Sequence, residues 1–512
     1  MQPNPYDEAV IPPRPILSGC HEAKFLLYCL RYFNTEREKT MNPILAAIDN
    51  VVNAISGFLY DPWVPVLLLA AGLYFTVRTG LIQFRLFGES IRVVTEKPAE
   101  KGGISSFGAL MVSTASRVGT GNIVGVSTAI CVGGYGAVFW MWVTAILGGA
   151  SAFIESTLAQ IYKKRDKDGT SYGGPSYYIE SGLKQRWLGV IFAVVLICTY
   201  AIGYNMLASY NLQSAFSGFS FYGSSTPIII GAILAVLFAA CVLGGAKRLT
   251  NITGVLVPVM GVIYILVAIA VICINIKLIP SVFGEIFAGA FDFKAIFGGF
   301  AGSAMMQGIK RGLYSNEAGM GSAPNAAATA DVSHPAKQGL VQMLSVFIDT
   351  LLICSATALM CLSSGLTPTE ALQGAPYVQQ SMAMTLGSFG PIFIAVSMSL
   401  FAFTTLIGNY YYCEGCIKYI LTRSPSKAFM TAFRLIATAI VFVGALLSAG
   451  LAWDTADLFQ AIMVVINIPV IVLLGKPALA ALKDYMRQRK EGKDPTFKAA
   501  DIGLKDKTDF WN

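Results

Sequence analysis

The sequence predicts an all-α polytopic membrane protein with about eleven transmembrane helices. Of its 512 residues, 55% are hydrophobic and only 13% are charged, whereas globular proteins carry about 25% charged residues. Apolar runs of about 20 residues recur along most of the chain, and each is long enough to cross a hydrocarbon core of about 30 Å as a helix. A transmembrane β-barrel would instead show alternating segments of about ten residues.

The two ends of the chain are polar. Residues 1–40 form an extension of mixed charge without the long apolar core of a signal peptide. An amphipathic pattern begins at Met41, so both Met1 and Met41 are candidate translation starts. Residues 481–512 form a charged cytoplasmic tail, and a surface helix and a polar helical external loop are expected at 81–94 and 367–384. The predicted spans are 62–79, 104–131, 136–162, 186–210, 225–247, 252–277, 295–313, 337–363, 388–420, 428–449 and 455–478.

Basic side chains concentrate in alternate loops, after the odd-numbered spans, with Lys277 and Lys294 as exceptions. The positive-inside rule therefore places the N-terminus outside and the C-terminus in the cytoplasm. Lys310 and Arg311 follow the seventh span, so this rule assigns them to the cytoplasmic face. The net charge of +8 thus reflects topology and does not indicate a nucleic-acid partner.

The predicted spans form two sets of five. Residues 41–103 contain the amphipathic helix, the first span and the surface helix, and the two sets occupy 104–277 and 278–480. Because each set has an odd number of spans, the second set should insert with the opposite orientation. Inverted repeats with interrupted helices in matching places are typical of secondary transporters.

Each set opens with a glycine-rich span. Glycine is less favourable than alanine inside a helix by about 1 kcal/mol, so a cluster of glycines favours unwound backbone; close helix packing is the alternative. Freed N–H groups attract a substrate carboxylate, and freed carbonyl groups attract Na⁺. The glycines are Gly119, Gly121 and Gly125 in the second span and Gly298, Gly299, Gly302 and Gly308 in the seventh.

The assignment of Lys310 and Arg311 to the cytoplasmic face affects where the second interruption is expected. It places the binding interruption upstream of them, within 298–307. The segment 315–324, SNEAGMGSAP, then becomes a cytoplasmic loop and part of an inner gate, with Asn316 and Glu317 available to bond across it.

Five further polar side chains lie within predicted spans. Arg117, Glu155 and Asp349 are charged residues at depth, which usually face the bundle interior or a cavity; a structural ion pair and a substrate role are both open. Thr404 and Thr405 can complete an oxygen shell around Na⁺ or bond back to their own helix. The cysteines lie mostly in apolar runs without metal-ligand spacing, and there are two histidines. No cofactor beyond a coupling Na⁺ and no enzymatic activity are expected.

Several motifs resemble those of the alanine or glycine:cation symporter family. They are GTGNI, GAVFWMW, GLYSNEAGMGSAP, HPAKQGLV with FIDT, and LFAFTT with YYYCEG, and the resemblance extends from residue 43 to residue 480. It implies the leucine-transporter fold, an inverted five-plus-five core with one extra N-terminal helix. It also implies Na⁺-coupled, sometimes H⁺-coupled, uptake of small neutral amino acids across the bacterial inner membrane.

Three places depart from the family pattern. The turn Gly133–Gly136 has Tyr135 where many members have proline, the segment Ala208–Leu212 replaces one that often carries glutamine, and Asn409 stands where many have tryptophan. The last two lie near the substrate side chain in the implied fold. A larger or more polar amino acid is therefore an alternative to alanine or glycine.

The sequence thus predicts a sodium-coupled symporter of small neutral amino acids. It is compatible with a monomer and leaves the oligomeric state open. The alternative is a proton-coupled or uncoupled transporter of a different amino acid or small solute on the same fold. The predicted substrate-binding residues are Thr120, Gly121, Asn122, Gly299, Gly302, Gln307 and Asn409; the ion-binding residues are Gly119, Asn122, Thr404 and Thr405; and the gate or structural residues are Arg117, Glu155, Asn316, Glu317 and Asp349.

Overall fold

The computed structural model describes residues 43–60, 63–98, 103–166, 169–291, 303–422, 425–504 and 508–511. The chain divides into two units, residues 1–48 and 49–512. The described part of the first unit is limited to the first turns of one helix, so the architecture below is that of residues 49–512. The predicted glycines Gly298, Gly299 and Gly302 lie outside the described residues.

The prediction of a mostly helical chain is confirmed. The N-terminal helices are α2 (Pro43–Tyr60), α3 (Trp63–Arg78), α4 (Ile82–Arg85) and α5 (Phe87–Val94). Phe87 and Ile91 of α5 are exposed whereas Ser90 and Val93 are buried, which is the two-sided pattern expected of a surface helix.

The next stretch, residues 103–274, contains an interrupted helix followed by long apolar helices. Ser105 caps the first half of the interrupted helix, α6, by accepting a hydrogen bond from the Gly108 amide (3.0 Å). The elements are α6 (Ser106–Arg117), η1 (Thr120–Asn122), α7 (Val124–Gly133), α8 (Gly136–Ile161), β1 (Lys164–Arg165), β2 (Ser171–Tyr172), α9 (Pro175–Leu183), α10 (Arg186–Ile197), the π-helical η2 (Cys198–Tyr204), α11 (Asn205–Ser214), α12 (Thr226–Val242) and α13 (Gly245–Ile274). The strands β1 and β2 pair antiparallel, with Lys164 opposite Tyr172.

The remaining stretch also contains an interrupted helix and long apolar helices. Ser303 caps α16 by accepting a hydrogen bond from the Met306 amide (3.2 Å), as Ser105 caps α6. The elements are α14 (Ile279–Ala290), α16 (Ala304–Asn316), α17 (Pro324–Ala327), α18 (Pro335–Val346), the π-helical η4 (Phe347–Cys354), α19 (Ser355–Leu362), η5 (Glu370–Leu372), α20 (Ala375–Leu386), α21 (Phe389–Leu421), α22 (Lys427–Gly444), α23 (Ala449–Lys490) and η6 (Ala499–Ile502).

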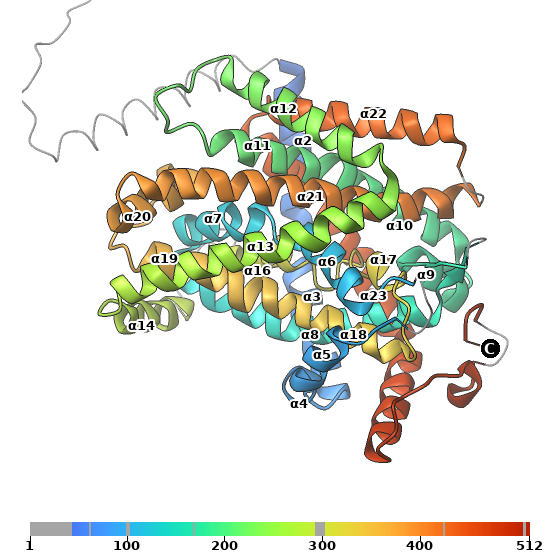
Figure 1. The fold of residues 1–512 in the computed structure, drawn as a ribbon. Coiled ribbons are helices and arrows are strands. Elements are labelled where there is room, and N and C mark those ends of the chain that lie inside the picture. The colour runs from blue at the N-terminus through green and yellow to red at the C-terminus, as the bar shows by residue number, and fades with distance from the viewer. Residues whose placement is uncertain are drawn as a thin grey trace, which may run out of the picture. The chain divides into compact units, whose positions relative to one another are not determined.

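Eight helical stretches of the described chain are long and apolar enough to cross a membrane, and three further apolar helices are shorter. The count of eleven spans and the inverted relation of the two sets stay predictions. The last helix, α23, continues to Lys490, well past the predicted end at residue 478. Its C-terminal turns project from the helical bundle at the lower right of Figure 1.

The structure corrects the predicted position of the second interruption. Within the described residues, α16 passes through Gln307 and Gly308 without a break, and the helix ends at Asn316. An interruption therefore lies within the motif 315–324, where a gate loop was predicted. Residues 298–302 of the predicted interruption lie outside the described residues. Gly308 serves helix packing instead, because a Cβ there would lie 2.6 Å from Trp140 Cβ.

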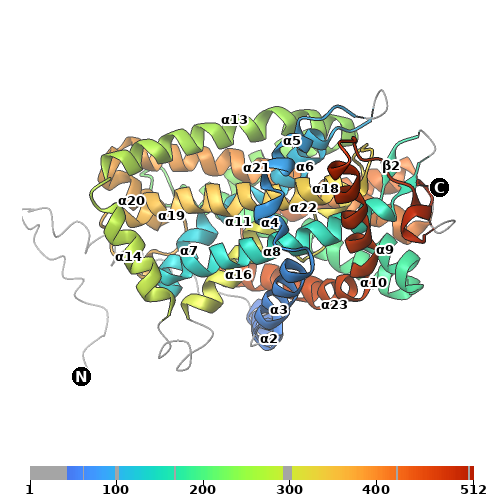
Figure 2. The ribbon, with the colours of Figure 1, turned by 90° about the horizontal axis from the view of Figure 1, so that it is seen from below.

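The neighbours of α16 also correct the placement of Lys310 and Arg311. The helices α16 and α8 lie side by side (Figures 1 and 2). Gly308 packs on Ala137 near the start of α8, while Gln160 near its end donates to the Ala327 carbonyl (2.5 Å). Lys310 and Arg311 thus lie toward the start of α8, at the opposite end from Lys163 and Lys164, which follow this helix. Both pair with the buried Asp457, at 2.8 and 3.2 Å.

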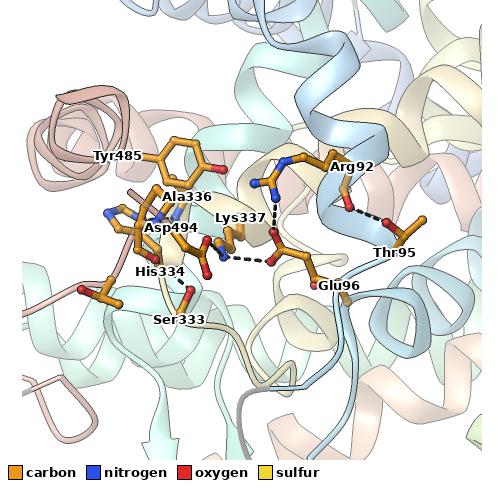
Figure 3. Close-up of polar contacts among 12 residues, drawn as sticks. Arg92, Thr95, Glu96, Ser333, His334, Ala336, Lys337, Tyr485 and Asp494 are labelled. Atoms are coloured by element: carbon orange, nitrogen blue, oxygen red, sulfur yellow. Dashed lines mark hydrogen bonds and ion pairs between the residues drawn. The ribbon is translucent and has the colours of Figure 1, made fainter. Parts of the chain in front are cut away.

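An ionic cluster joins the segment after α5, the start of α18 and the segment after α23 (Figure 3). Lys337 Nζ lies 2.8 Å from Glu96 and 2.9 Å from Asp494. His334 caps α18, since its Nδ1 accepts a bond from the Ala336 amide (3.1 Å), and its Nε2 faces Asp484 Oδ2 (3.4 Å). The cap requires an unprotonated Nδ1, so this end of α18 is built around a neutral histidine.

Acid should destabilise this end of the protein through His334. Burial, opposed by the Asp484 carboxylate and assisted by Lys337, lowers the pKa of His334 from 6.5 to about 4. Between these values only the unfolded chain binds the proton, so stability falls as the pH drops from 6.5 to 4, by up to about 3 kcal/mol. We expect His334→Gln to flatten this part of the profile, measured as melting temperature against pH in detergent. Parallel profiles for the two proteins would contradict the neutral cap.

Candidate functional site

Two interrupted helices meet in the interior of residues 49–512. The first consists of α6, η1 and α7, and the second of α16 and α17. A Cβ placed on Gly121 would lie 2.8 Å from the Tyr314 ring, and Asn122 Nδ2 donates to Ser315 Oγ (3.0 Å). The helices α7 and α16 accordingly run next to each other (Figure 2). The end of α16 thus rests directly on the interruption in the first helix.

The first interruption leaves backbone amides free. After Arg117 the backbone becomes extended at Gly119 (φ −144°), and Thr120–Asn122 form a single 3₁₀ turn. Asn122 Oδ1 accepts the Gly119 amide (2.8 Å). The amides of Thr120 and Gly121 make no hydrogen bond within the described chain. Two free, buried N–H groups that follow each other form a concave donor site that suits a carboxylate.

The second interruption depends on left-handed backbone. Glu317 (φ 55°), Gly319 (φ 85°) and Gly321 (φ 83°) all lie in this region, which glycine adopts without steric cost. The buried Glu155 carboxylate accepts the Gly319 and Gly321 amides, at 3.3 and 3.1 Å. Asn467 Nδ2 donates to Glu155 (2.9 Å) and to the Gly319 carbonyl (2.9 Å). Glu155 therefore holds the second interruption open by occupying its amides.

A buried carboxylate lies between the two interruptions. Asp349, in the π-helical η4, accepts bonds from Asn122 Nδ2 (2.7 Å), Ser315 Oγ (2.8 Å) and Thr350 Oγ1 (2.8 Å). Asn122 Nδ2 also lies 3.2 Å from Cys354 Sγ. The exposed fraction of Asp349 is 0%. A carboxylate with hydroxyl groups from two helices is an oxygen-rich, anionic site of the kind that hard cations prefer.

A second buried carboxylate begins a chain of hydrogen bonds across four elements. Glu317 accepts from Ser116 Oγ (2.8 Å) and Ser322 Oγ (2.8 Å). Ser116 Oγ is also 2.8 Å from Asn409 Oδ1, and Asn409 Nδ2 donates to Asn205 Oδ1 (3.0 Å). This chain ties α6, the second interruption, α21 and α11 together. A movement of either interruption must therefore break or carry these bonds.

Arg117 provides the positive charge in this acidic interior. It is 1% exposed, and its electrostatic field acts on Glu155, Glu317 and Asp349. Within the described chain, its Nη1 donates to the Gln342 carbonyl (3.4 Å) and to Gln342 Oε1 (3.3 Å), and its Nε and Nη2 have no partner. The structural ion pair left open for Arg117 is therefore absent among the described residues. One cation balances three carboxylates at a distance.

The two predicted threonines differ in their surroundings. Thr405 Oγ1 is buried and has no partner in the described chain. It points at the first interruption, since a Cβ placed on Gly119 would lie 1.9 Å from it. Thr404 Oγ1 bonds back to Leu400 O (3.0 Å) and Phe401 O (3.1 Å) of its own helix. Thr405 thus faces the interruption and Thr404 does not.

Of the other predicted site residues, some lie at the two interruptions and some lie away from them. Thr120 Oγ1 accepts from Asn211 Nδ2 (3.2 Å), and Asn316 donates to Thr350 Oγ1 (3.2 Å). Gln307 instead packs against Gly133 at the far end of α7, away from the interruption. Gly299 and Gly302 lie outside the described residues.

Several members of these clusters are absent from the sequence-based set. They are Ser116, Asn205, Asn211, Tyr314, Ser315, Gln342 and Asn467. Tyr314 and Ser315 belong to the long motif that carries the family resemblance, which was a usable signal. Asn211 lies in one of the segments that depart from the family pattern. The others are single polar residues in apolar helices, which no spacing distinguishes from residues bonded to their own backbone.

Two interrupted membrane helices around buried charged and amide groups define a secondary transporter. A model of the sodium:alanine symporter family matches residues 45–499. The chain therefore belongs to the sodium:alanine symporter family. It is a multi-pass membrane transporter, not an enzyme, and the family couples amino-acid movement to sodium.

Curated relatives match over nearly their whole length. The chain is 46% identical to the amino-acid carrier protein AlsT of Bacillus subtilis over 458 residues, 89% of this chain and 96% of that protein. It is 44% identical to the probable sodium/glutamine symporter GlnT of Bacillus subtilis, with 88% and 93% of the two chains covered. It is 37% identical to the sodium/alanine symporter AgcS of Methanococcus maripaludis, with 86% and 98% covered.

Proposed function

We propose that the protein takes up small neutral amino acids of the alanine or glycine class together with Na⁺. The observation that carries this proposal is the double contact of Asn122. Its Nδ2 bonds the Asp349 carboxylate (2.7 Å) and its Oδ1 bonds the Gly119 amide (2.8 Å). A cation at Asp349 thereby acts on the backbone that presents the Thr120 and Gly121 amides.

In this mechanism the substrate carboxylate binds the free amides of the first interruption. The Tyr314 ring covers Gly121 and limits the size of the substrate. Asp349, Ser315 and Thr350 supply oxygens to Na⁺, and Thr405 supplies a hydroxyl near Gly119. The substrate and Na⁺ are released when the hydrogen bonds that connect Glu317, Ser116 and Asn409 rearrange. This rearrangement is the gating role proposed for the cluster.

The direct test is uptake of labelled alanine and glycine into proteoliposomes, with inward gradients of Na⁺ or of choline as the control. One Na⁺ carried with a neutral substrate moves one charge, worth about 2.3 kcal/mol per 100 mV, which sustains roughly a 40-fold accumulation. We expect accumulation with Na⁺ only. Equal uptake in choline, uptake driven by a pH gradient alone, or no uptake of any small amino acid would overturn the proposal.

Glutamine is a second candidate substrate. Asn211 and Asn409 place carboxamides beside Thr120 and Ser116, close to the first interruption, and one relative bears the name of a sodium/glutamine symporter. Competition of unlabelled glutamine against labelled alanine distinguishes the two. If unlabelled glutamine inhibits the uptake more strongly than unlabelled alanine does, glutamine is the preferred substrate.

The two threonines should respond differently to removal of the hydroxyl group. We expect Thr405→Val to raise the Na⁺ concentration for half-maximal uptake about 5-fold, the loss of roughly one polar contact. Thr404→Val is the matched control and should leave this concentration unchanged, because its hydroxyl is bonded to its own helix. The measurement is uptake against Na⁺ concentration. Equal shifts in both variants would remove Thr405 from the ion site.

A further inference from the structure

A charged cavity lies at the end of the protein opposite to Lys310 and Arg311. Its volume is about 700 Å³, and it is bounded by the strand that follows α8, by α9, by the start of α10 and by the end of α21. Tyr172, Tyr177 and Tyr419 form aromatic walls. None of its lining residues belongs to the interrupted helices or to the ion site proposed above.

The cavity carries an excess of positive charge. Five basic and three acidic side chains line it, which gives a net charge of +2. The three acids are each paired with one of the basic residues. The pairs are Lys164 with Asp509 (3.0 Å), Arg186 with Glu180 (3.1 Å) and Lys418 with Asp166 (2.9 Å).

Two cations remain without an acidic partner in the described chain. Arg165 is exposed and stacks over the Phe510 ring, 4.4 Å from its centroid. Lys184 is exposed and follows the last turn of α9 with left-handed backbone (φ 60°). Two such cations around one cavity match the charge and the several oxygens of a phosphate group.

The cavity lies at the level where apolar helices end. One candidate span ends at Ile161, a second begins at Arg186, and a third ends at Leu421. Lining residues directly follow, begin or end these spans. This is the level at which phospholipid headgroups meet a membrane protein.

An apolar strip leads away from the cavity along α10. Trp187, Ile191 and Val194 follow the i, i+4, i+7 spacing of one helix face and are 62%, 43% and 46% exposed. Trp187 directly follows the cavity residue Arg186, and tryptophan is typical of the interface between headgroups and hydrocarbon. A ligand with a phosphate head and an apolar tail fits both features, whereas a free phosphate uses only the first.

We propose that this cavity binds the headgroup of an anionic phospholipid, whose acyl chains lie along Trp187, Ile191 and Val194. Arg165 and Lys184 hold the phosphate. Asp509, from the C-terminal segment, competes with it for Lys164. The proposal does not depend on the transported substrate.

Full-length protein in a maltoside detergent provides the test, titrated by calorimetry with diheptanoyl phosphatidylglycerol or diheptanoyl phosphatidylcholine. We expect saturable binding of phosphatidylglycerol only. Arg165→Gln combined with Lys184→Gln should weaken it about 25-fold. Asp509→Asn should strengthen it, because Lys164 is released.

Matched controls separate a site from general charge attraction. Lys427→Gln combined with Lys483→Gln removes two exposed basic residues outside the cavity and should leave binding unchanged. An equal loss in this control, or equal binding of phosphatidylcholine, overturns the proposal. Displacement of the lipid by inorganic phosphate at a similar concentration would assign a free anion instead. Gel filtration of every variant verifies the fold, and the expected gain in Asp509→Asn does not depend on a loss of function.

Discussion

Asp349→Asn is expected to abolish sodium-driven amino-acid uptake at physiological Na⁺ concentrations. The substitution keeps the size of the side chain and an oxygen for the bond from Asn122 Nδ2, which is 2.7 Å long. It removes the only formal charge among the oxygens proposed to bind Na⁺. A unit charge about 4 Å away contributes about 4 kcal/mol at an effective dielectric constant of 20, so the affinity for Na⁺ should fall on the order of 1000-fold.

Equilibrium binding separates this effect from a general defect. Binding of labelled alanine or glycine to the purified protein, measured against Na⁺ concentration, should lose its Na⁺ dependence in Asp349→Asn. Glu370→Gln removes an exposed acid in η5 and is the matched control, for which we expect no change. A variant of Asp349 that folds and keeps the parental Na⁺ dependence would show that the ion binds elsewhere.

Composition and glycine patterns predicted the membrane class and the first interruption. Gly119 and Gly121 lie where side chains are excluded, since a Cβ would meet Thr405 Oγ1 and the Tyr314 ring. The signal succeeded because these glycines are needed by the unwound backbone itself. Arg117, Glu155 and Asp349 could also be singled out, because charges in apolar helices are costly unless the interior solvates them.

For the second interrupted helix, the glycine pattern and the positions of basic residues led to wrong predictions. Gly308 and Gly312 are glycines of an intact helix, and they allow α16 to approach α8 closely. The interruption begins at Glu317, a residue with no special preference for left-handed backbone. Lys310 and Arg311 misled the charge argument because both pair with the buried Asp457. The positive-inside rule applies to basic residues of loops, and a paired cation inside the bundle does not report orientation.

Arg117→Met should destabilise the folded protein by about 3 to 5 kcal/mol. Arg117 is the cation whose field reaches Glu155, Glu317 and Asp349 together. Methionine fills much of the same volume but leaves three buried carboxylates without a positive neighbour. We expect a lower melting temperature and a reduced yield of monodisperse protein. Lys427→Met, at an exposed position, is the control for the loss of one positive charge and should melt like the parent.

Arg117→Lys then distinguishes charge from geometry. Lysine keeps the positive charge but has a single, compact donor group. If Arg117 acts as a distant counter-charge, as its weak bonds to Gln342 (3.3 and 3.4 Å) indicate, lysine should restore most of the lost stability. Its Nε and Nη2, which have no partner among the described residues, are donors that a transport intermediate can use. We therefore expect uptake by Arg117→Lys to stay low although the protein is folded. Full recovery of uptake would restrict Arg117 to the electrostatic role, and a melting temperature of Arg117→Met equal to that of the parent would contradict both roles.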